Sequence, residues 1–598
     1  MPCVMQQTPT QRGINNMTAS VTNRNKLLDI NNLTIDFRTD EGLVRAVDDV
    51  SLSVREGEVM GLVGESGSGK SATAKAIMRL HPGNTIFQKP SQINFYHNDQ
   101  AHSILTLRER KLNLVRGGQV SMIFQEPMAS FAPAITLGEQ MIETMQIHRR
   151  IDRATARKEG IALFDRVGIP MPDKRFDQYV FELSGGMRQR AMIAMALSTQ
   201  PKLLIADEPT TALDVTIQAQ VLELMLELRE QMGMAMIFIT HDLGVIGKVA
   251  DNVTVMQRGR VVEAGAMEQV IYHPQHEYTQ RLLNSLPHLS TLSDVKTDTL
   301  EPFLTVSHAQ IQYPAAGAKR NGEAFTAVKD ISLTLPKGKI IGLVGESGSG
   351  KTSLGKAMLG AVPLSHGEII FHGEHPLKLQ AKGKIPRREI AARGQMVFQD
   401  PYSSLNPRMT VRDIIAEPLE AMGLTKSKAE TDARVIEIAK LCKLNIDHLR
   451  RFPHAFSGGQ RQRISIARAL VCNPQFLVAD ESVAALDVSI QAEILNLLKS
   501  LRDELNLTIL FISHDLSVIA NLCDWVCVMK QGELIEEGSV RKIFLDPQAP
   551  YTQRLIGAIP LLDQKKLDAA CEPLNTLSTA TPAQPQGCLQ SRYRVING

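Results

Sequence analysis

Long hydrophobic runs are missing from this sequence of 598 residues. No stretch approaches the ~18 consecutive apolar residues that a membrane-spanning helix needs, and the first twenty residues have no apolar core like that of a secretion signal. We therefore expect a chain that neither crosses a membrane nor enters a secretion route. Charge of one sign is lacking too, with 66 Lys and Arg against 63 Asp and Glu. So small a surplus gives no indication of nucleic-acid binding.

Cysteine is scarce and dispersed. An odd number of cysteines, lying mostly in apolar segments, is not a disulfide framework and favours a reducing compartment. Aromatic residues make up 5%, apolar residues 43% and charged residues 22%, which is typical of soluble globular proteins and excludes disorder and collagen. The length suggests roughly three to five domains. The seven cysteines are Cys3, Cys442, Cys472, Cys523, Cys527, Cys571 and Cys588.

The sequence contains an internal repeat. EVMGLVGESGSGKSAT at 58–73 returns as KIIGLVGESGSGKTSL at 339–354. Four further pairs follow in the same order: IFQEP at 123–127 and VFQDP at 397–401, LSGGMRQR at 183–190 and FSGGQRQR at 456–463, LLIADEPTTALD at 203–214 and FLVADESVAALD at 476–487, IFITHDLGVI at 237–246 and LFISHDLSVI at 510–519. The repeat predicts an extension at 1–25, a first domain at 26–285, a linker at 286–302, a second domain at 303–561 and a tail at 562–598.

Short apolar runs alternate with helical patterns in each copy. In the first copy, Val59–Val63, Leu203–Ala206 and Ala235–Thr240 are predicted to be buried strands, and the segments 186–197 and 216–230 amphipathic helices. This alternation predicts an α/β fold with a mostly parallel sheet covered on both faces.

The repeated glycine-rich block has the pattern of a phosphate-binding loop. It follows an apolar strand and opens a helix, a context that makes an accidental match improbable in two copies. Its backbone N–H groups would surround phosphate oxygens, its lysine would neutralise them, and its last hydroxyl would reach Mg²⁺. The candidate residues are Gly64, Glu65, Ser66, Gly67, Ser68, Gly69, Lys70 and Ser71, and in the second copy Gly345, Glu346, Ser347, Gly348, Ser349, Gly350, Lys351 and Thr352.

Polar residues follow the later apolar strands of both copies. Asp207 and Asp480 could hold Mg²⁺, while the adjacent Glu208 and Glu481 could orient and deprotonate an attacking water. An acidic pair at a strand end is more often a helix cap, but its place after a phosphate loop favours catalysis. His241 and His514 could bind the γ-phosphate and hold the water, although a lone histidine there is commonly structural.

A Ser-Gly-Gly block opens a basic helix in each copy. It comprises Ser184, Gly185 and Gly186 in the first and Ser457, Gly458 and Gly459 in the second. The serine is a good N-cap, and the cap geometry presents backbone N–H groups that can bind another anion. A cap needs no second glycine, so the doubled glycine favours close approach to a ligand.

These blocks, in this order, resemble the ATP-binding cassette ATPases. The resemblance implies two tandem cassette domains, each a P-loop ATPase core with a mostly parallel sheet, an antiparallel β part and a helical subdomain. It also implies that the cassettes meet head to tail and enclose two ATP molecules. One site would use Lys70, Ser71, Gln125, Asp207, Glu208 and His241 with Ser457, Gly458, Gly459 and Asp487; the other would use Lys351, Thr352, Gln399, Asp480, Glu481 and His514 with Ser184, Gly185, Gly186 and Asp214.

The resemblance assigns further roles. Gln125 and Gln399 would contact Mg²⁺ and the attacking water and relay site occupancy to a membrane partner. Phe37 and Tyr313 are candidates to stack on adenine, although an aromatic residue in a strand usually belongs to the core. Phe456 and Ser482 depart from the usual pattern without removing a group that the chemistry needs.

A narrower resemblance points to the peptide/nickel branch of bacterial importers. It rests on QDPYSSLNP at 399–407, AALDVSIQAEIL at 484–495, HEYTQRLL at 276–283 and APYTQRLI at 549–556. It implies uptake of glutathione or another small peptide through two integral membrane permease subunits, served by a periplasmic solute-binding protein, at the cytoplasmic face of the inner membrane. One chain would supply both cassettes, so no homodimer is needed. With only Cys571 and Cys588 in the tail, we expect no iron–sulfur cluster.

Two alternatives belong to other classes. A soluble tandem-cassette factor acting on ribosomes or DNA would be expected to have a charged helical insert, zinc cysteines or coiled-coil arms, and none appears in the sequence. A scaffold that only senses ATP conflicts with two intact Glu–His pairs. Within the importer hypothesis, the segments 131–145 and 405–419 are the predicted docking sites for membrane subunits.

Overall fold

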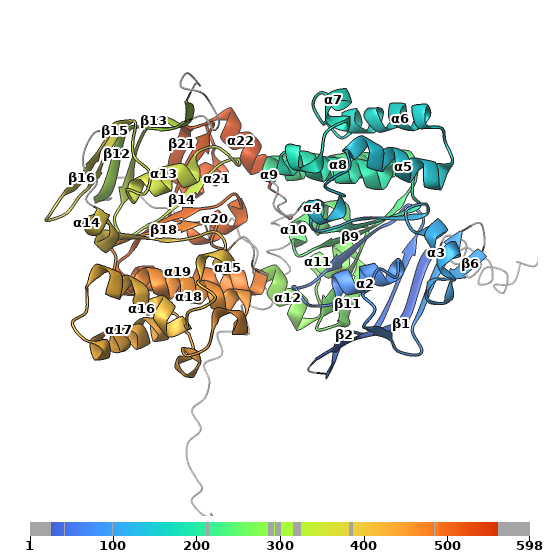
Figure 1. Cartoon of the computed structure of the whole chain (residues 1–598), viewed down its shortest axis with the longest axis horizontal. Helices are drawn as coiled ribbons and strands as arrows, with labels where there is room; N and C mark the ends of the chain where they lie inside the picture. The colour runs from blue at the N-terminus through green and yellow to red at the C-terminus, as the bar shows by residue number, and fades with distance from the viewer. Residues whose placement is uncertain are drawn as a thin grey trace, which may run out of the picture.

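The computed structural model describes residues 26–40, 42–97, 100–210, 214–284, 292, 301–314, 324–381, 387–483, 486, 488–559 and 562. Residues 26–284, the first copy, and residues 301–559, the second copy, form two α/β lobes of one design that lie side by side (Figure 1). None of the helices in these ranges is long and apolar enough to cross a membrane.

A six-stranded sheet forms the centre of each copy. The strands are parallel apart from an antiparallel strand at one edge. The short apolar strands β3, β8 and β9 are buried along their whole length, as expected for a parallel sheet with both faces covered, whereas the edge strand β11 is partly exposed. The order is β11 (Arg260–Ala266), β10 (Asn252–Gln257), β3 (Val59–Val63), β9 (Ala235–Thr240), β8 (Leu203–Asp207), β7 (Val120–Ile123), and in the second copy β21 (Glu533–Ser539), β20 (Trp525–Lys530), β14 (Ile340–Val344), β19 (Thr508–Ile512), β18 (Phe476–Asp480), β17 (Gly394–Val397).

An antiparallel sheet accompanies each central sheet. In the second copy its order is β13 (Phe325–Pro336), β12 (Pro302–Tyr313), β15 (His366–Phe371), β16 (Leu377–Gln380). In the first copy it is β2 (Gly42–Arg55), β1 (Lys26–Thr39), β5 (Gln92–His97), β6 (Gln100–Ser103). The first copy also has β4 (Thr85–Phe87), which pairs with β1 and lies where its sequence is longer than that of the second copy.

Helices cover the sheets and build a separate helical part in each copy. In the first copy they are α2 (Lys70–Ile77), α3 (Glu109–Val115), α4 (Pro127–Ser130), α5 (Leu137–Arg149), α6 (Arg153–Arg166), α7 (Pro172–Phe176), α8 (Gly185–Leu197), α9 (Val215–Met232), α10 (Leu243–Val249), α11 (Met267–Tyr272) and α12 (Glu277–Asn284). In the second they are α13 (Lys351–Met358), α14 (Arg387–Arg393), α15 (Pro401–Ser404), α16 (Val411–Met422), α17 (Lys428–Leu441), α18 (Gly458–Leu470), α19 (Val488–Leu505), α20 (Leu516–Leu522), α21 (Val540–Leu545) and α22 (Pro550–Gly557).

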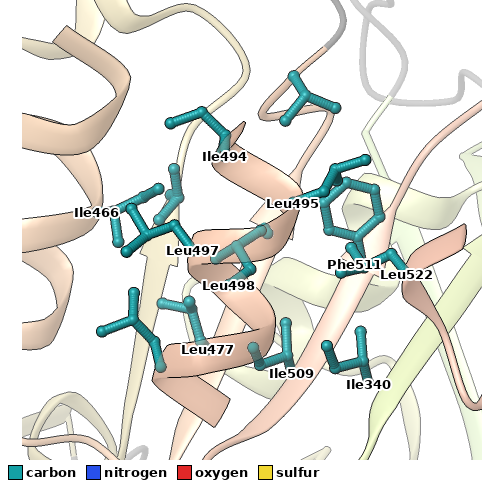
Figure 2. Close-up of a cluster of buried hydrophobic side chains, with 14 of the residues drawn as sticks. Ile340, Ile466, Leu477, Ile494, Leu495, Leu497, Leu498, Ile509, Phe511 and Leu522 are labelled. Carbon is teal, nitrogen blue, oxygen red and sulfur yellow. The ribbon is translucent and has the colours of Figure 1, made fainter. Parts of the chain in front are cut away.

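Buried aliphatic side chains join helices to sheet in each core. In the second copy, α19 contributes Ile494, Leu495, Leu497 and Leu498 to one buried cluster with Ile466 of α18, Leu477 of β18, Ile509 and Phe511 of β19 and Ile340 of β14 (Figure 2). These side chains are buried, so the layer between helix and sheet excludes water and fixes the strand ends, where the candidate site residues lie.

The two copies share part of their cores. Val215, at the start of α9, belongs to the buried cluster of the second copy, and α9 contacts α22. In the opposite direction, Leu562 belongs to the buried cluster of the first copy, and Lys248 donates a hydrogen bond to the carbonyl of Ile559 at 3.0 Å. The helical parts α5–α7 and α16–α17 lie at opposite corners of the molecule (Figure 1), so the copies are arranged head to tail.

Candidate ATP sites

Each glycine-rich block forms a tight loop between a buried strand and a helix. In the first copy the loop follows β3, and α2 begins at Lys70. Gly64 has φ +149°, and a Cβ at this position would collide with the carbonyl oxygen of Met256. Gly345 repeats this geometry with Met529. Only glycine fits so close to the neighbouring strand end, which explains this part of the motif.

The lysine of each loop is buried and bound to loop carbonyls. Lys70 Nζ donates to the carbonyls of Gly64 and Glu65, both at 2.7 Å. Lys351 makes the same pair of bonds at 2.7 and 2.8 Å. Burial lowers the pKa of Lys351, and the nearby charge of Asp214 acts in the opposite direction. The ammonium group therefore lies inside the loop, where it can meet an anion.

A hydroxyl and a carboxylate lie together beside each loop. Ser71 donates to Asp207 and Thr352 donates to Asp480, both at 3.0 Å. Burial raises the pKa of both aspartates, so a nearby cation would stabilise their ionised form. No cluster of three or more His, Cys, Asp and Glu that could hold a metal occurs in the described ranges. The oxygen pair suits Mg²⁺, a hard cation that takes few protein ligands together with phosphates.

Each predicted catalytic glutamate is held by a glutamine and a histidine. Glu208 Oε2 accepts from Gln125 Nε2 at 2.8 Å, and its Oε1 lies 3.2 Å from His241 Nδ1. Glu481 has the same partners in Gln399 at 2.7 Å and His514 at 3.2 Å. The structure thus brings together three residue types that are far apart in the sequence.

The backbone and the charges of these glutamates are also unusual. Glu208 and Glu481 have φ of 48° and 45°, a conformation that costs energy for a residue with a side chain. The hydrogen bond to Glu481 raises the pKa of His514 and in turn lowers that of Glu481. Burial opposes protonation of His241, but the hydrogen bond to Glu208 and the charges of Glu208 and Asp242 together raise its pKa. In both pairs the glutamate thus favours the protonated imidazole, and in the second copy the imidazole favours the ionised Glu481 carboxylate.

The Ser-Gly-Gly blocks cap helices. Ser184 accepts from the amide of Met187 at the start of α8, and Ser457 accepts from that of Gln460 at the start of α18. A Cβ on Gly459 would collide with Ile490 of the same copy. The second glycine of this copy is thus also favoured by packing of α18 on α19, whereas a Cβ on Gly186 would meet Ile217 only at an ordinary 3.5 Å; close approach of a ligand to these glycines stays a prediction. Neither serine hydrogen-bonds to the opposite loop in the part of the chain that the structure describes.

The predicted adenine-stacking residues lie in different surroundings. Phe37 packs edge-on against His81 with ring centroids 5.8 Å apart. Tyr313 donates from its hydroxyl to Ser353, at the start of α13, at 3.1 Å. Both rings are half-buried, and their contact with adenine stays a prediction.

Two hydrogen bonds join a predicted site across the two copies. Asp214 Oδ1 accepts from the backbone amide of Ser347 at 2.8 Å, and Thr216 donates to the Glu346 carboxylate at 3.3 Å. The counterpart of Asp214, Asp487, lies outside the described residues. Two tyrosines that were not assigned from the sequence, Tyr278 and Tyr551, also touch the loops; the signal that could have found them is the repeated Y-T-Q-R-L.

Comparison with known protein families identifies the family to which this chain belongs. Residues 47–211 and 328–484 match the family model described as ABC transporter. The chain belongs to the ABC transporter family. Residues 262–304 and 535–591 also match the model of an oligopeptide/dipeptide transporter C-terminal region.

Curated relatives of this ABC transporter chain match along most of its length. The glutathione import ATP-binding protein GsiA of Pectobacterium atrosepticum is 43% identical over 572 residues, covering 90% of each chain. That of Escherichia coli K12 is 42% identical with the same coverage. A solved structure, CbiO1 from Clostridium perfringens, is 25% identical, covers 46% of this chain and 99% of its own, and gives a TM-score of 0.37.

The comparisons confirm the predictions of two tandem cassette domains and of an importer ATPase. The protein is an ATP-binding subunit that couples ATP hydrolysis to import. The alternative of a factor acting on ribosomes or DNA gains no support from them.

Proposed function

We propose that this subunit drives uptake of glutathione or another small peptide through two separate integral membrane permease subunits, at the cytoplasmic face of the bacterial inner membrane. A periplasmic solute-binding protein would deliver the solute. The names of the relatives support glutathione, and the matched C-terminal region supports a peptide. The single observation that carries the energy-coupling role is the duplicated Gln–Glu–His arrangement beside a phosphate loop.

The proposed chemistry uses the same groups in both copies. Lys70 and Lys351 would leave their loop carbonyls for the phosphates of ATP, while the Ser71–Asp207 and Thr352–Asp480 pairs would hold Mg²⁺. When bound, Mg²⁺ neutralises phosphate charge. Glu208 and Glu481 would orient the attacking water and take its proton, because each carboxylate is already positioned by a glutamine and a histidine.

The two sites are proposed to form between the copies of one chain. The Asp214–Ser347 bond supports a head-to-tail arrangement in which the loop of the second copy is completed by the first. On this proposal Ser184 and Ser457 reach the opposite nucleotide only when the copies close. The same proposal includes the division into domains at 26–285 and 303–561. It also includes one chain that needs no homodimer and the lack of an iron–sulfur cluster.

A surface groove beside Gln399 supports docking of a membrane subunit. It measures about 560 Å³ and lies between β17, the adjoining Phe398, α15, α16 and α18. Phe398 is 45% exposed on this surface, with Arg468 6.0 Å from the centre of its ring. In the first copy, Met128 and Ile135 are exposed after Gln125. Apolar side chains beside a residue that touches the catalytic glutamate could transmit site occupancy to a permease helix.

The test is uptake of labelled glutathione by cells that lack the gene for this chain and carry either the wild-type or the Glu208→Gln, Glu481→Gln gene. Wild type should restore uptake, and the double variant should not. Competition with unlabelled dipeptides would then define the solute. Full uptake with the double variant would contradict the proposal, and restoration of dipeptide but not glutathione uptake would correct the solute.

A further inference from the structure

The Y-T-Q-R-L elements place a buried tyrosine behind each phosphate loop. They lie in α12 and α22, which follow the last strand of each copy. Tyr278 is 2% exposed and Tyr551 6% exposed. A buried phenol needs a hydrogen-bond partner for its hydroxyl.

The partner is a backbone amide of the loop in both copies. Glu65 N–H donates to the Tyr278 hydroxyl at 3.0 Å, and Glu346 N–H donates to the Tyr551 hydroxyl at 3.3 Å. The bonded residues are 213 and 205 positions apart in the sequence. The same contact thus forms twice in one chain, between the corresponding residues of each copy.

The tyrosine and the loop lysine bind the same peptide group. The Gly64–Glu65 peptide donates its N–H to Tyr278 and accepts a bond from Lys70 Nζ at its carbonyl, at 2.7 Å. In a trans peptide these two groups point in opposite directions. The peptide is therefore fixed between the tyrosine on the outside of the loop and the lysine inside it. Gly345–Glu346 has the same arrangement with Tyr551 and Lys351.

The rings have different neighbours, whereas the hydroxyl contact is shared. Lys530 Nζ lies 4.7 Å from the centre of the Tyr551 ring, and the last residue of the corresponding strand β10 is Gln257. A tyrosine that only filled space would need no common hydroxyl partner. In the second copy the next amide, that of Ser347, is bound by Asp214, so successive amides of that loop are held by both copies.

We propose that Tyr278 and Tyr551 are positioning residues for ATP binding: each hydroxyl orients the peptide that carries the lysine, so that the loop is shaped before nucleotide arrives. The inference rests on the proposed function of these loops as ATP sites. It gives the region matched as an oligopeptide/dipeptide transporter C-terminal region a role inside the ATPase. Neither tyrosine reaches the reacting atoms, so their effect is expected on binding rather than on chemistry.

The experiment compares the full chain with Tyr278→Phe, Tyr551→Phe and the double variant, which lose only the hydroxyl. One neutral hydrogen bond corresponds to a rise of about two- to tenfold in KM for Mg·ATP, with kcat nearly unchanged. Thr279→Val and Thr552→Val are the matched controls, because these threonines are the next residues in the same helices and are fully buried. They should leave KM unchanged. An unchanged KM in the double tyrosine variant, or an equal rise in the controls, would overturn the inference.

Two further measurements separate the possible failures. Hydrogen exchange of the Glu65 and Glu346 amides should be faster in the phenylalanine variants. This measurement does not depend on the ATPase kinetics, which a lower stability of the variants could obscure. Unchanged exchange would overturn the contact itself. Lys70→Ala with Lys351→Ala tests the ATP sites independently of the tyrosines. If the lysine variant still binds ATP fully, the proposed function fails; if it does not and the tyrosine variants are normal, only the present inference fails.

Discussion

Asp214 in the first copy accepts a hydrogen bond from the backbone amide of Ser347 in the second, at a distance of 2.8 Å. The aspartate lies at the start of α9, and the serine lies in the phosphate loop that contains Lys351. A residue of one copy therefore helps to shape the loop of the other.

This contact predicts that Asp214 and Lys351 act in one site. Asp214→Ala should reduce ATPase activity in the wild-type background but have little further effect after Lys351→Ala, with a coupling free energy of about 0.5–3 kcal/mol. Asp214→Ala combined with Lys70→Ala is the control, because it damages both sites and should cost nearly the sum of the single effects. Steady-state ATPase rates measure both pairs. If the effects of the two substitutions simply added in both double variants, Asp214 and Lys351 would not act in one site.

The Gln–Glu–His arrangement predicts separate effects on binding and turnover. Glu208→Gln with Glu481→Gln keeps the side-chain shape but removes the base, so ATP binding should persist while turnover falls by about 10²–10⁴-fold. Glu227→Gln, on the exposed side of α9, is the matched control and should be neutral. Equilibrium binding and phosphate release are the measurements. A double variant that hydrolyses ATP at the normal rate would remove the glutamates from the mechanism.

The groove beside Gln399 predicts an effect on assembly alone. Phe398→Glu introduces charge into the exposed apolar surface and should weaken co-purification with permease subunits and solute uptake, without changing ATP binding. Leu545→Glu, at a residue that is 49% exposed elsewhere in the same copy, controls for surface charge. If Phe398→Glu supports normal uptake and recovery of permeases, the docking surface lies elsewhere.

Four described cysteines predict a strong pH dependence of labelling. Burial raises the pKa of Cys442 to about 12 and raises those of Cys472, Cys523 and Cys527 as well. Because the thiolate is the reactive form, only about one Cys442 in ten thousand is ionised at pH 8. Alkylation of the native chain should be slow at Cys442 and accelerate about tenfold per pH unit, since deprotonation limits it. Unfolding in urea should make it fast. Mass spectrometry of labelled peptides gives the rates, and equally rapid native labelling would contradict the burial.

Most of the site could be predicted because its signals are local. The loop from Gly64 to Ser71 needs glycines, a lysine and a hydroxyl at fixed spacing, and Glu208 and His241 directly follow buried strands. Such patterns can be recognised from a few neighbouring residues of the sequence. The contact of Tyr278 with Glu65 is not local: it depends on how α12 packs against a loop formed more than 200 residues earlier. The packing of Gly459 could not be predicted for the same reason, because the side chain it accommodates, Ile490, comes from another helix.

The exchange of buried side chains between the copies has a consequence for biosynthesis. Lys248 and Gly247 leave the ribosome about 300 residues before Ile559 and Leu562, which bind and cover them. The first copy therefore emerges with part of its apolar surface open and is completed only when translation of the second copy is nearly finished. During that interval an apolar surface of the first copy stays exposed until later residues of the same chain bury it. This favours association of the two copies within one polypeptide over association with a copy from another polypeptide.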